Sequence, residues 1–215
     1  SNSTITGDSD GDFFGYTLGG GDLDFDGYED MVSGAAGEDV GDLSRAGCIY
    51  VISGNADMPG GTASVGWAAD LSICGTASNQ RLGRHGVPQL VDVDGDLSLD
   101  LVVSGPGDDY AGTDGEGEVY VFFNDGGLEG HLSTDDADVT LTAGTADSFG
   151  YALHSGDFDG DGSQELAIGA PDTTGEEDAL SDPGEVFIFR FSTLAEGGLF
   201  SASAADLHMR GDGAT

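Results

Sequence analysis

The sequence predicts an all-β protein made of three β-propeller blades, each with four antiparallel strands. Three Asp-rich segments begin at residues 22, 92 and 157, so their starts are 70 and 65 residues apart. Gly75, Gly144 and Gly211 each end a strand-like pattern, and they are 69 and 67 residues apart. The segments between them show no helical periodicity. Units of four short strands repeated in tandem are typical of propeller blades.

Each unit contains the same elements in the same order. An apolar residue and a glycine come first, an Asp-rich segment follows, and then a β-type run at 31–35, 101–106 or 166–171. A glycine and an alternating strand come next, at 47–52, 117–122 and 184–189. A final strand ends at the closing glycine. Short runs of β-branched and apolar residues between turn residues predict strands.

These positions set the expected boundaries of the blades at 13–75, 76–144 and 145–211. Gly7 ends one further fourth-strand pattern, so residues 1–12 would be the end of a preceding blade and a connecting turn. Residues 212–215 would begin the next connection. Because propellers usually contain about four to eight blades, we expect the three blades to belong to a larger propeller or to complete a ring by association.

Composition excludes several classes of partner. The chain has 41 acidic residues and 5 basic ones, which gives a formal net charge of -36. A nucleic-acid binder needs a cationic patch, and docking on an anionic membrane surface needs basic residues. The longest apolar run has five residues, 119–123, whereas a spanning helix needs about 20. We therefore expect no nucleic-acid partner and no membrane insertion.

The Asp-rich segments are candidate calcium loops. Acids occupy positions 1, 3, 5 and 9 of each loop, and closely spaced oxygen ligands suit Ca²⁺ better than Mg²⁺. The backbone carbonyl at position 7 would add a ligand, and glycines such as Gly27, Gly160 and Gly162 allow the tight turn. The predicted ligands of the three sites are Asp22, Asp24, Asp26, Tyr28 and Asp30; Asp92, Asp94, Asp96, Ser98 and Asp100; and Asp157, Asp159, Asp161, Ser163 and Glu165.

These loops have two other possible interpretations. Asp-Gly pairs are good turn formers in hairpins without any metal. However, three loops at one repeat phase, each with four acids in nine residues, favour a cation that offsets the repulsion. An EF-hand loop leads into a helix and takes a Glu at position 12, whereas here a strand follows position 9.

The combined motif resembles the FG-GAP repeat of integrin α-subunit propellers and of bacterial surface proteins. It consists of Phe-Gly, then Asp-x-Asp-x-Asp-x-x-x-Asp/Glu, then Gly-Ala-Pro, which is intact at residues 169–171. The second unit departs from it, with Leu82-Gly83 in place of Phe-Gly. The resemblance implies that calcium lies in the hairpin between the first and second strands. It also implies that the opposite face is formed by acidic loops at about 36–46, 106–117 and 171–183, which would suit a basic partner or remain solvated.

The leading functional hypothesis is a non-enzymatic module of an exported or cell-surface protein, used for binding or adhesion and stabilised by three Ca²⁺ ions. Its partner would be a protein or a glycan, and an extracellular site is favoured over the periplasm. One alternative is the scaffold domain of a secreted hydrolase or lyase. Another is a lectin-like propeller that stacks sugars on Tyr16, Tyr110, Tyr151 or Trp67, although aromatic residues at this density are usually core.

Two smaller features carry predictions of their own. Cys48 opens the third strand of the first unit and Cys74 closes its fourth, where the third unit has Glu185 and Arg210. Because opposite charges suit adjacent strands, the two cysteines are expected to face each other, as a disulfide or as two buried thiols. The tripeptide at 210–212, Arg-Gly-Asp, is one that integrins recognise, but its glycine is the strand-ending glycine of the repeat, which favours coincidence.

Overall fold

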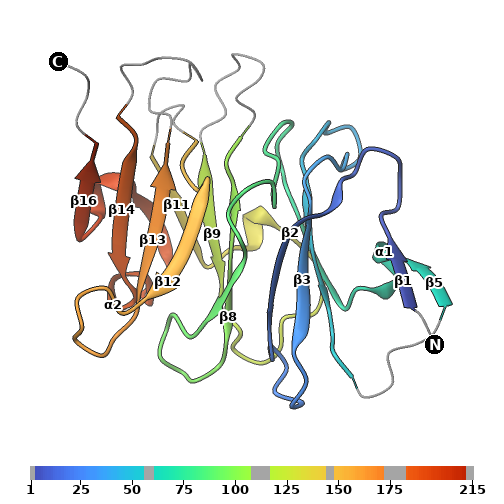
Figure 1. Ribbon diagram of the computed structural model, residues 1–215, viewed down its shortest axis with the longest axis horizontal. Helices are drawn as coiled ribbons and strands as arrows, with labels where there is room; N and C mark the ends of the chain where they lie inside the picture. Colours follow the sequence, from blue (N-terminus) through green and yellow to red (C-terminus); the bar gives the residue numbers. More distant parts are fainter. Residues whose placement is uncertain (1–2, 56–60, 108–116, 144–147, 172–182, 212–215) are drawn as a thin grey trace.

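A computed structural model describes residues 3–55, 61–107, 117–143, 148–171 and 183–211, and within these the chain forms successive β-sheets. Three of the sheets lie side by side in chain order (Figure 1). Each contains four consecutive antiparallel strands of one repeat, so the prediction of all-β propeller blades is confirmed. Blade 1 consists of β2 (Phe14–Gly21), β3 (Asp30–Ala35), β4 (Cys48–Ile52) and β6 (Leu71–Cys74).

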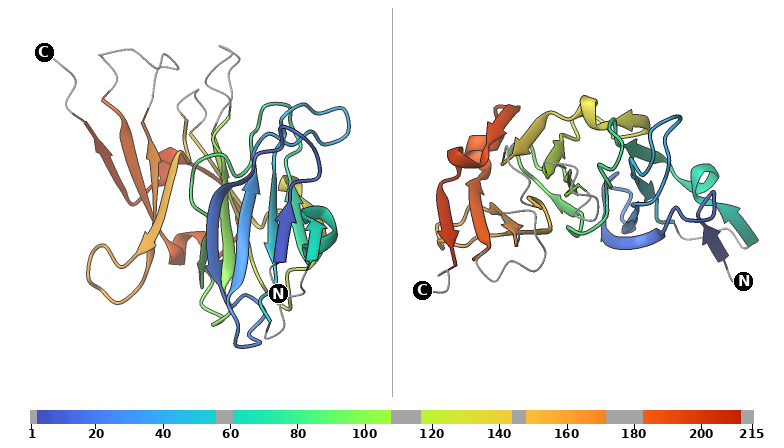
Figure 2. Two further views of the ribbon diagram at one scale, coloured as in Figure 1. Left: turned by 45° about the vertical axis from the view of Figure 1, so that its right-hand side comes forward. Right: turned by 90° about the horizontal axis from the view of Figure 1, so that it is seen from above.

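The other two blades repeat this order. Blade 2 consists of β7 (Gln89–Val91), β8 (Asp100–Gly105), β9 (Glu118–Phe122) and β11 (Val139–Thr142). Blade 3 consists of β12 (Ala152–Gly156), β13 (Glu165–Ala170), β14 (Glu185–Arg190) and β16 (Leu207–Arg210). The first strands β2, β7 and β12 lie next to one another. In each blade the fourth strand is the one farthest from the first. Figure 2 shows the succession of blades from above.

The structure contains a fifth strand in each repeat that the sequence pattern did not predict. These strands are β5 (Gly61–Ser64), β10 (Gly130–Ser133) and β15 (Gly198–Ser201). Each lies in the connection between the third and fourth strands of its repeat and pairs in parallel with an outer strand of the preceding unit: β10 with β6, and β15 with β11. Their pairing partners belong to the preceding unit, so no pattern within one repeat indicates them.

The N-terminal strand β1 (Ser3–Thr6) fits the same scheme. It pairs in parallel with β5, as β6 pairs with β10. It therefore occupies the place that the fourth strand of a preceding blade would take.

Short helical turns adjoin the fifth strands. They are α1 (Val65–Ala68), η2 (Thr134–Asp136), α2 (Phe191–Leu194) and η3 (Ala202–Ala204). Each has three or four residues, so no helix among the described residues is long and apolar enough to cross a membrane.

The hydrophobic core lies mainly between the blades. One buried cluster joins blades 1 and 2, with Leu82 of the second repeat packed among Ile49 and Val51 of the first. Another joins blades 2 and 3, with Phe149 of the third repeat among side chains such as Val119 of the second. Burial of apolar surface at about 25 cal/mol per Å² is what holds neighbouring blades together.

The two cysteines form a disulfide across one blade. Cys48 and Cys74 are directly opposite on β4 and β6, and their sulfur atoms are bonded at 2.05 Å. In blade 3 the equivalent residues are Glu185 and Arg210, which are also opposite, with Arg210 Nε 3.4 Å from Glu185 Oε1. The aspartate that follows Gly211 lies outside the described residues.

Candidate metal centres

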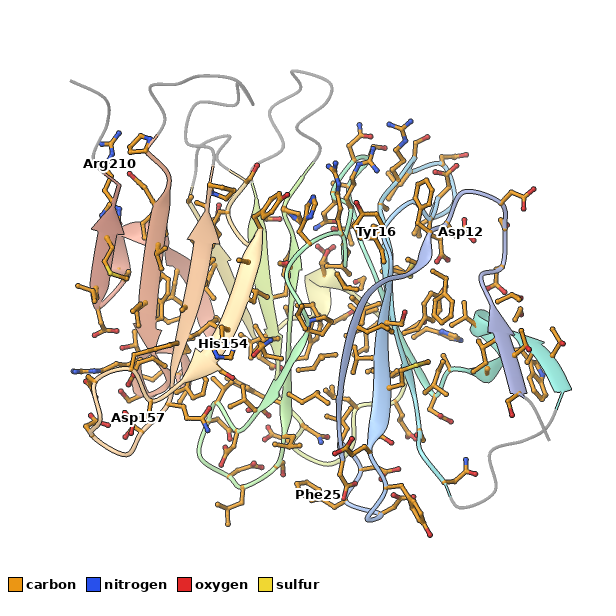
Figure 3. The ribbon with its side chains drawn as sticks, in the orientation of Figure 1. Asp12, Tyr16, Phe25, His154, Asp157 and Arg210 are labelled. Atoms are coloured by element: carbon orange, nitrogen blue, oxygen red, sulfur yellow. A yellow bond between two sulfur atoms is a disulfide. The ribbon has the colours of Figure 1, made fainter. Side chains whose placement is uncertain are left out.

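The three Asp-rich loops occupy equivalent places in the fold. They connect the first and second strands of blades 1, 2 and 3, and all three lie on the lower face in Figure 1. Figure 3 labels Phe25 in the first loop and Asp157 in the third, both on this face, while Tyr16, Asp12 and Arg210 lie at the opposite end. The fold therefore places the candidate ligands on one side of the molecule.

One hydrogen-bond pattern recurs in all three loops. In the first loop, Asp24 Oδ1 accepts from the Asp26 backbone N–H at 3.0 Å, and Asp26 Oδ1 accepts from the Tyr28 N–H at 2.8 Å. The corresponding distances are 3.0 and 2.6 Å in the second loop and 3.1 and 2.8 Å in the third. Each of these carboxylates uses Oδ1 to hold the turn, which leaves Oδ2 as the oxygen to offer to an ion. In the second loop, Asp96 Oδ2 also accepts from Ser98 Oγ at 3.2 Å.

The first acid of each loop closes the turn. Asp22, Asp92 and Asp157 each accept from the backbone N–H at position 6, at 3.0, 3.1 and 3.0 Å. Position 6 has a positive φ in all three loops, held by Gly27, Leu97 and Gly162. Position 4 also has a positive φ in all three loops, and it is held by Phe25 in the first loop and by glycine in the other two. Non-glycine residues in this region cost about 1 kcal/mol, so the third loop, with glycine at both positions, is the least strained.

The acid at position 9 has a role that the sequence pattern did not predict. Asp30 is buried, and its two oxygens accept from the backbone N–H groups of Leu23 and Gly54, both at 2.8 Å. Asp100 does the same with Val93 at 2.7 Å and Asn124 at 2.9 Å. These carboxylates tie the first and second loops to the end of the third strand of their blades. Burial raises the pKa of Asp100 above its usual range, although the two backbone N–H bonds oppose the shift.

Three carboxylates in each loop converge to within 4.8 Å of one another. These groups are Asp22, Asp24 and Asp30; Asp92, Asp94 and Asp96; and Asp157, Asp159 and Glu165. The fourth predicted acid of each loop, Asp26, Asp100 or Asp161, does not belong to its group of three. Ligation through the carbonyls of Tyr28, Ser98 and Ser163 stays a prediction. A fourth cluster, of Glu38 with the two cysteines, is no metal site of this kind because the disulfide occupies both sulfur atoms.

Two buried carboxylate oxygens in these loops have no hydrogen-bond partner among the described residues. They are Asp22 Oδ1 and Glu165 Oε1. The other Glu165 oxygen, Oε2, accepts from the Phe158 N–H at 2.9 Å. A buried carboxylate oxygen without a partner is costly, and coordination to a cation would remove that cost. Asp22 and Glu165 both belong to the convergent groups, so the donor set fits a hard cation such as Ca²⁺.

The third loop differs from the others in having a basic neighbour. Arg190, the last residue of β14, donates from Nη2 to Asp159 Oδ2 at 2.8 Å. This bond holds the pKa of Asp159 below its usual range. The equivalent positions in blades 1 and 2 are Ser53 and Phe123. The guanidinium therefore occupies the oxygen that Asp159 would offer to an ion.

The structure describes part of the face opposite the Asp-rich loops. Tyr16, His85 and Tyr151 form a row of ring contacts there, with His85 stacked on Tyr151 at a centroid distance of 3.9 Å. Tyr16 and Tyr151 are partly exposed, and Trp67 on α1 is largely exposed rather than part of the core. Residues 108–116 and 172–182, which carry most of the predicted acidic residues of this face, lie outside the described residues, as does Tyr110.

The comparisons with known proteins agree with the repeat pattern. The model of the FG-GAP repeat matches residues 14–52 and 149–189, the two repeats in which Phe-Gly is intact. Integrin alpha-PS2 of Drosophila melanogaster is 32% identical over 89% of this chain, and integrin alpha-IIb of Homo sapiens is 30% identical over 77%. The phosphatidylinositol-glycan-specific phospholipase D of Dictyostelium discoideum is 24% identical over 98%.

This chain spans a small part of each relative. It covers 13% and 15% of the two integrin subunits and 23% of the Dictyostelium phospholipase. The similarity therefore concerns the repeat region. The repeated strand order, the three loops and the two matches to the repeat model lead to one conclusion: the chain belongs to the FG-GAP repeat family.

Proposed function

We propose that this chain is a calcium-binding, non-catalytic section of an FG-GAP β-propeller that serves binding or adhesion outside the cell. The proposed blades span 13–75, 76–144 and 145–211, with 1–12 belonging to a preceding blade and its connection and 212–215 to the next connection. The ions are structural in this proposal, and the opposite face carries the ligand, a protein or a glycan.

One observation supports the calcium sites most strongly. Three loops from different repeats hold three carboxylates each within 4.8 Å, and two of the loops also contain a buried oxygen without a donor. Turn formation alone accounts for the backbone hydrogen bonds but leaves these two oxygens unsatisfied. Ca²⁺ tolerates six to eight oxygen ligands in irregular geometry, whereas Mg²⁺ requires a near-ideal octahedron. Carboxylates clustered on a single loop suit Ca²⁺.

Three features support the extracellular location. Calcium sites of extracellular modules work at about 10⁻⁴–10⁻³ M, a concentration that the cytosol does not supply. The Cys48–Cys74 disulfide is typical of an oxidising compartment. Two of the relatives are named integrin alpha subunits, which also favours adhesion as the role of the module.

Thermal unfolding with and without calcium tests the proposal. Binding to the folded state adds RT ln(1 + [L]/Kd), or about 2.7 kcal/mol per site at 100 times Kd. The melting temperature should therefore rise in millimolar CaCl₂, rise less in MgCl₂, and fall in EDTA. Asp22→Asn should remove part of the calcium effect. Asp42→Asn, at an exposed acid of the opposite face, is the matched control and should leave it intact. Equal midpoints in calcium and EDTA would rule out structural ions.

A second candidate function rests on the similarity to phosphatidylinositol-glycan-specific phospholipase D, which extends over 98% of this chain. In that case the propeller would be the accessory domain of an enzyme. Hydrolysis of a glycolipid or polysaccharide by the purified chain would favour the enzyme. Glycan binding that persists after removal of divalent ions would instead favour a lectin.

A further inference from the structure

One position at the end of the third strand is held in the same way in all three blades. Ser53, Phe123 and Arg190 occupy it, and each donates its backbone N–H to an aspartate shortly before the fourth strand. The accepting oxygens are Asp70 Oδ2 at 3.0 Å, Asp138 Oδ2 at 2.8 Å and Asp206 Oδ2 at 2.9 Å. The backbone contact is therefore common to the three blades, and the side chain at this position is what differs between them.

In blade 3 this side chain is a guanidinium close to two acids. Arg190 donates from Nη2 to Asp159 Oδ2, the carboxylate at position 3 of the third loop, at 2.8 Å. The hydrogen bond to Asp159, together with the charges of Asp159 and Asp206, raises the pKa of Arg190 above its ordinary value. Blade 3 thus shows what the acids around this position hold when a guanidinium is supplied.

In blade 2 the same position is apolar. Phe123 is partly buried and packs against the hydrophobic cluster that joins blades 2 and 3. Its aspartate, Asp138, is exposed and accepts from the Phe123 backbone N–H as described above. Blade 2 therefore provides the same backbone arrangement with an aromatic ring in place of a cation.

In blade 1 the position carries only the short side chain of Ser53, and a cavity of about 240 Å³ lies beside it. Asp24 and Asp70 line this cavity, and they are the equivalents of the two acids around Arg190. Glu129, from the second repeat, adds a third carboxylate. All five arginines of the chain lie among the described residues, none of them lines the cavity, and the chain has no lysine.

The walls of the cavity combine an apolar floor with a charged rim. Leu23, Val51 and Leu71 are buried members of the cluster that joins blades 1 and 2, and Leu128 packs against that cluster. The three carboxylates at the rim are exposed. The volume is below the roughly 300–1,000 Å³ of pockets for drug-sized ligands, so it suits a single side chain. An apolar stem with a cationic head is the type of side chain that such walls accommodate.

A second metal ion fits this cavity less well than an organic cation does. Asp24 belongs to the convergent group of the first loop, but Asp70 and Glu129 do not. The carboxylates around the cavity are therefore too widely spaced to converge on one ion. A planar guanidinium with five N–H donors can instead bridge separate carboxylates.

We propose that this cavity binds an arginine side chain of a partner protein. The guanidinium lies on Asp24 and Asp70, as Arg190 lies on Asp159, and the methylene groups pack against Leu71 and Leu128. The site lies on the face of the Asp-rich loops, so it is a contact separate from the ligand proposed for the opposite face. Because Asp24 also belongs to the first calcium group, arginine and calcium compete at this loop.

Binding of N-acetyl-arginine amide tests the proposal. In EDTA, at about 0.15 M salt and below the melting midpoint, the probe should shift the backbone amide signals of Ser53, Leu71 and Leu128 saturably in nuclear magnetic resonance spectra. N-acetyl-lysine amide carries the same charge without the planar fork, so it reports general attraction to the acidic protein and should bind more weakly.

Three variants locate the site. Ser53→Arg supplies the guanidinium from within the chain and should abolish probe binding. Asp70→Asn keeps an oxygen that can accept from the Ser53 N–H and should weaken binding by about two- to fivefold. Asp138→Asn makes the same change in blade 2, where Phe123 occupies the position, and should bind the probe like the wild type.

The competition can also be measured from the calcium side, with the other two loops loaded. A probe concentration equal to its Kd should raise the calcium concentration that half-saturates the first loop by about twofold, by the linkage of competing ligands. Absence of saturable shifts, equal binding of the lysine probe, or undiminished binding to Ser53→Arg would overturn the proposal. Equal losses in Asp70→Asn and Asp138→Asn would do the same. The melting test for calcium can fail or succeed independently of these results.

Discussion

Replacing both cysteines of blade 1 by alanine should lower the stability of the protein substantially. The Cys48–Cys74 bridge joins adjacent strands and closes a loop with a sequence separation of 26. The chain-entropy relation gives about 3.5 kcal/mol for a closed loop of that length. For a protein of this size, 1 kcal/mol corresponds to about 2–4 °C. The double variant should therefore melt about 7–14 °C below the wild type.

Differential scanning calorimetry in calcium measures this difference, and blade 3 offers a matched control. Arg210→Ala breaks the ion pair at the equivalent strand position. Because that arginine is largely exposed, its loss should cost no more than about 1 kcal/mol. Thiol titration of the denatured wild type should find no free thiol. Two titratable thiols, or a double variant that melts within about 2 °C of the wild type, would refute the reasoning.

Three further predictions concern the loops and one half-buried acid, Glu38. Arg190→Ser removes the ion pair with Asp159 and should raise the calcium affinity of the third loop by about two- to fivefold. Ser53→Arg places a guanidinium at the equivalent position and should lower the calcium affinity of the first loop. Isothermal titration calorimetry measures both affinities. Leu97→Gly should stabilise the calcium-free protein by about 0.5–1 kcal/mol, because it removes a left-handed leucine; an unchanged midpoint in EDTA would contradict this. Burial raises the pKa of Glu38, so the folded state holds this proton more tightly than the unfolded state. The free energy of unfolding should then fall as pH rises from about 4 through the folded pKa. Glu38→Gln should flatten that slope in EDTA melts, while the exposed control Glu196→Gln should not.

Several parts of the candidate sites could be predicted from the sequence, and the structure brings them together. The acids at positions 1 and 3 of every loop lie in the convergent groups, because alternation through a tight turn is a local property. The clamping role of Asp30 and Asp100 could not be predicted in the same way. Their hydrogen bonds to Gly54 and Asn124 both span 24 residues, and no local spacing indicates them. The same holds for Arg190 and Asp159, which are 31 residues apart.

The sequence by itself determined the repeat, the antiparallel strands of each unit and the acidic composition of the loops. These features depend on consecutive residues and on a period of 65–70 residues, both of which can be read along the chain. The tertiary structure alone decided how the repeats are joined. The fifth strands β10 and β15 pair in parallel with the outer strand of the preceding unit, so their hydrogen-bond partners lie outside their own repeat. Glycines such as Gly34 likewise let the backbone of the next repeat approach closely, since a Cβ atom there would lie 2.4 Å from Gly83 O. Contacts of this kind depend on how two units pack in space, and the sequence pattern within one unit does not specify that packing.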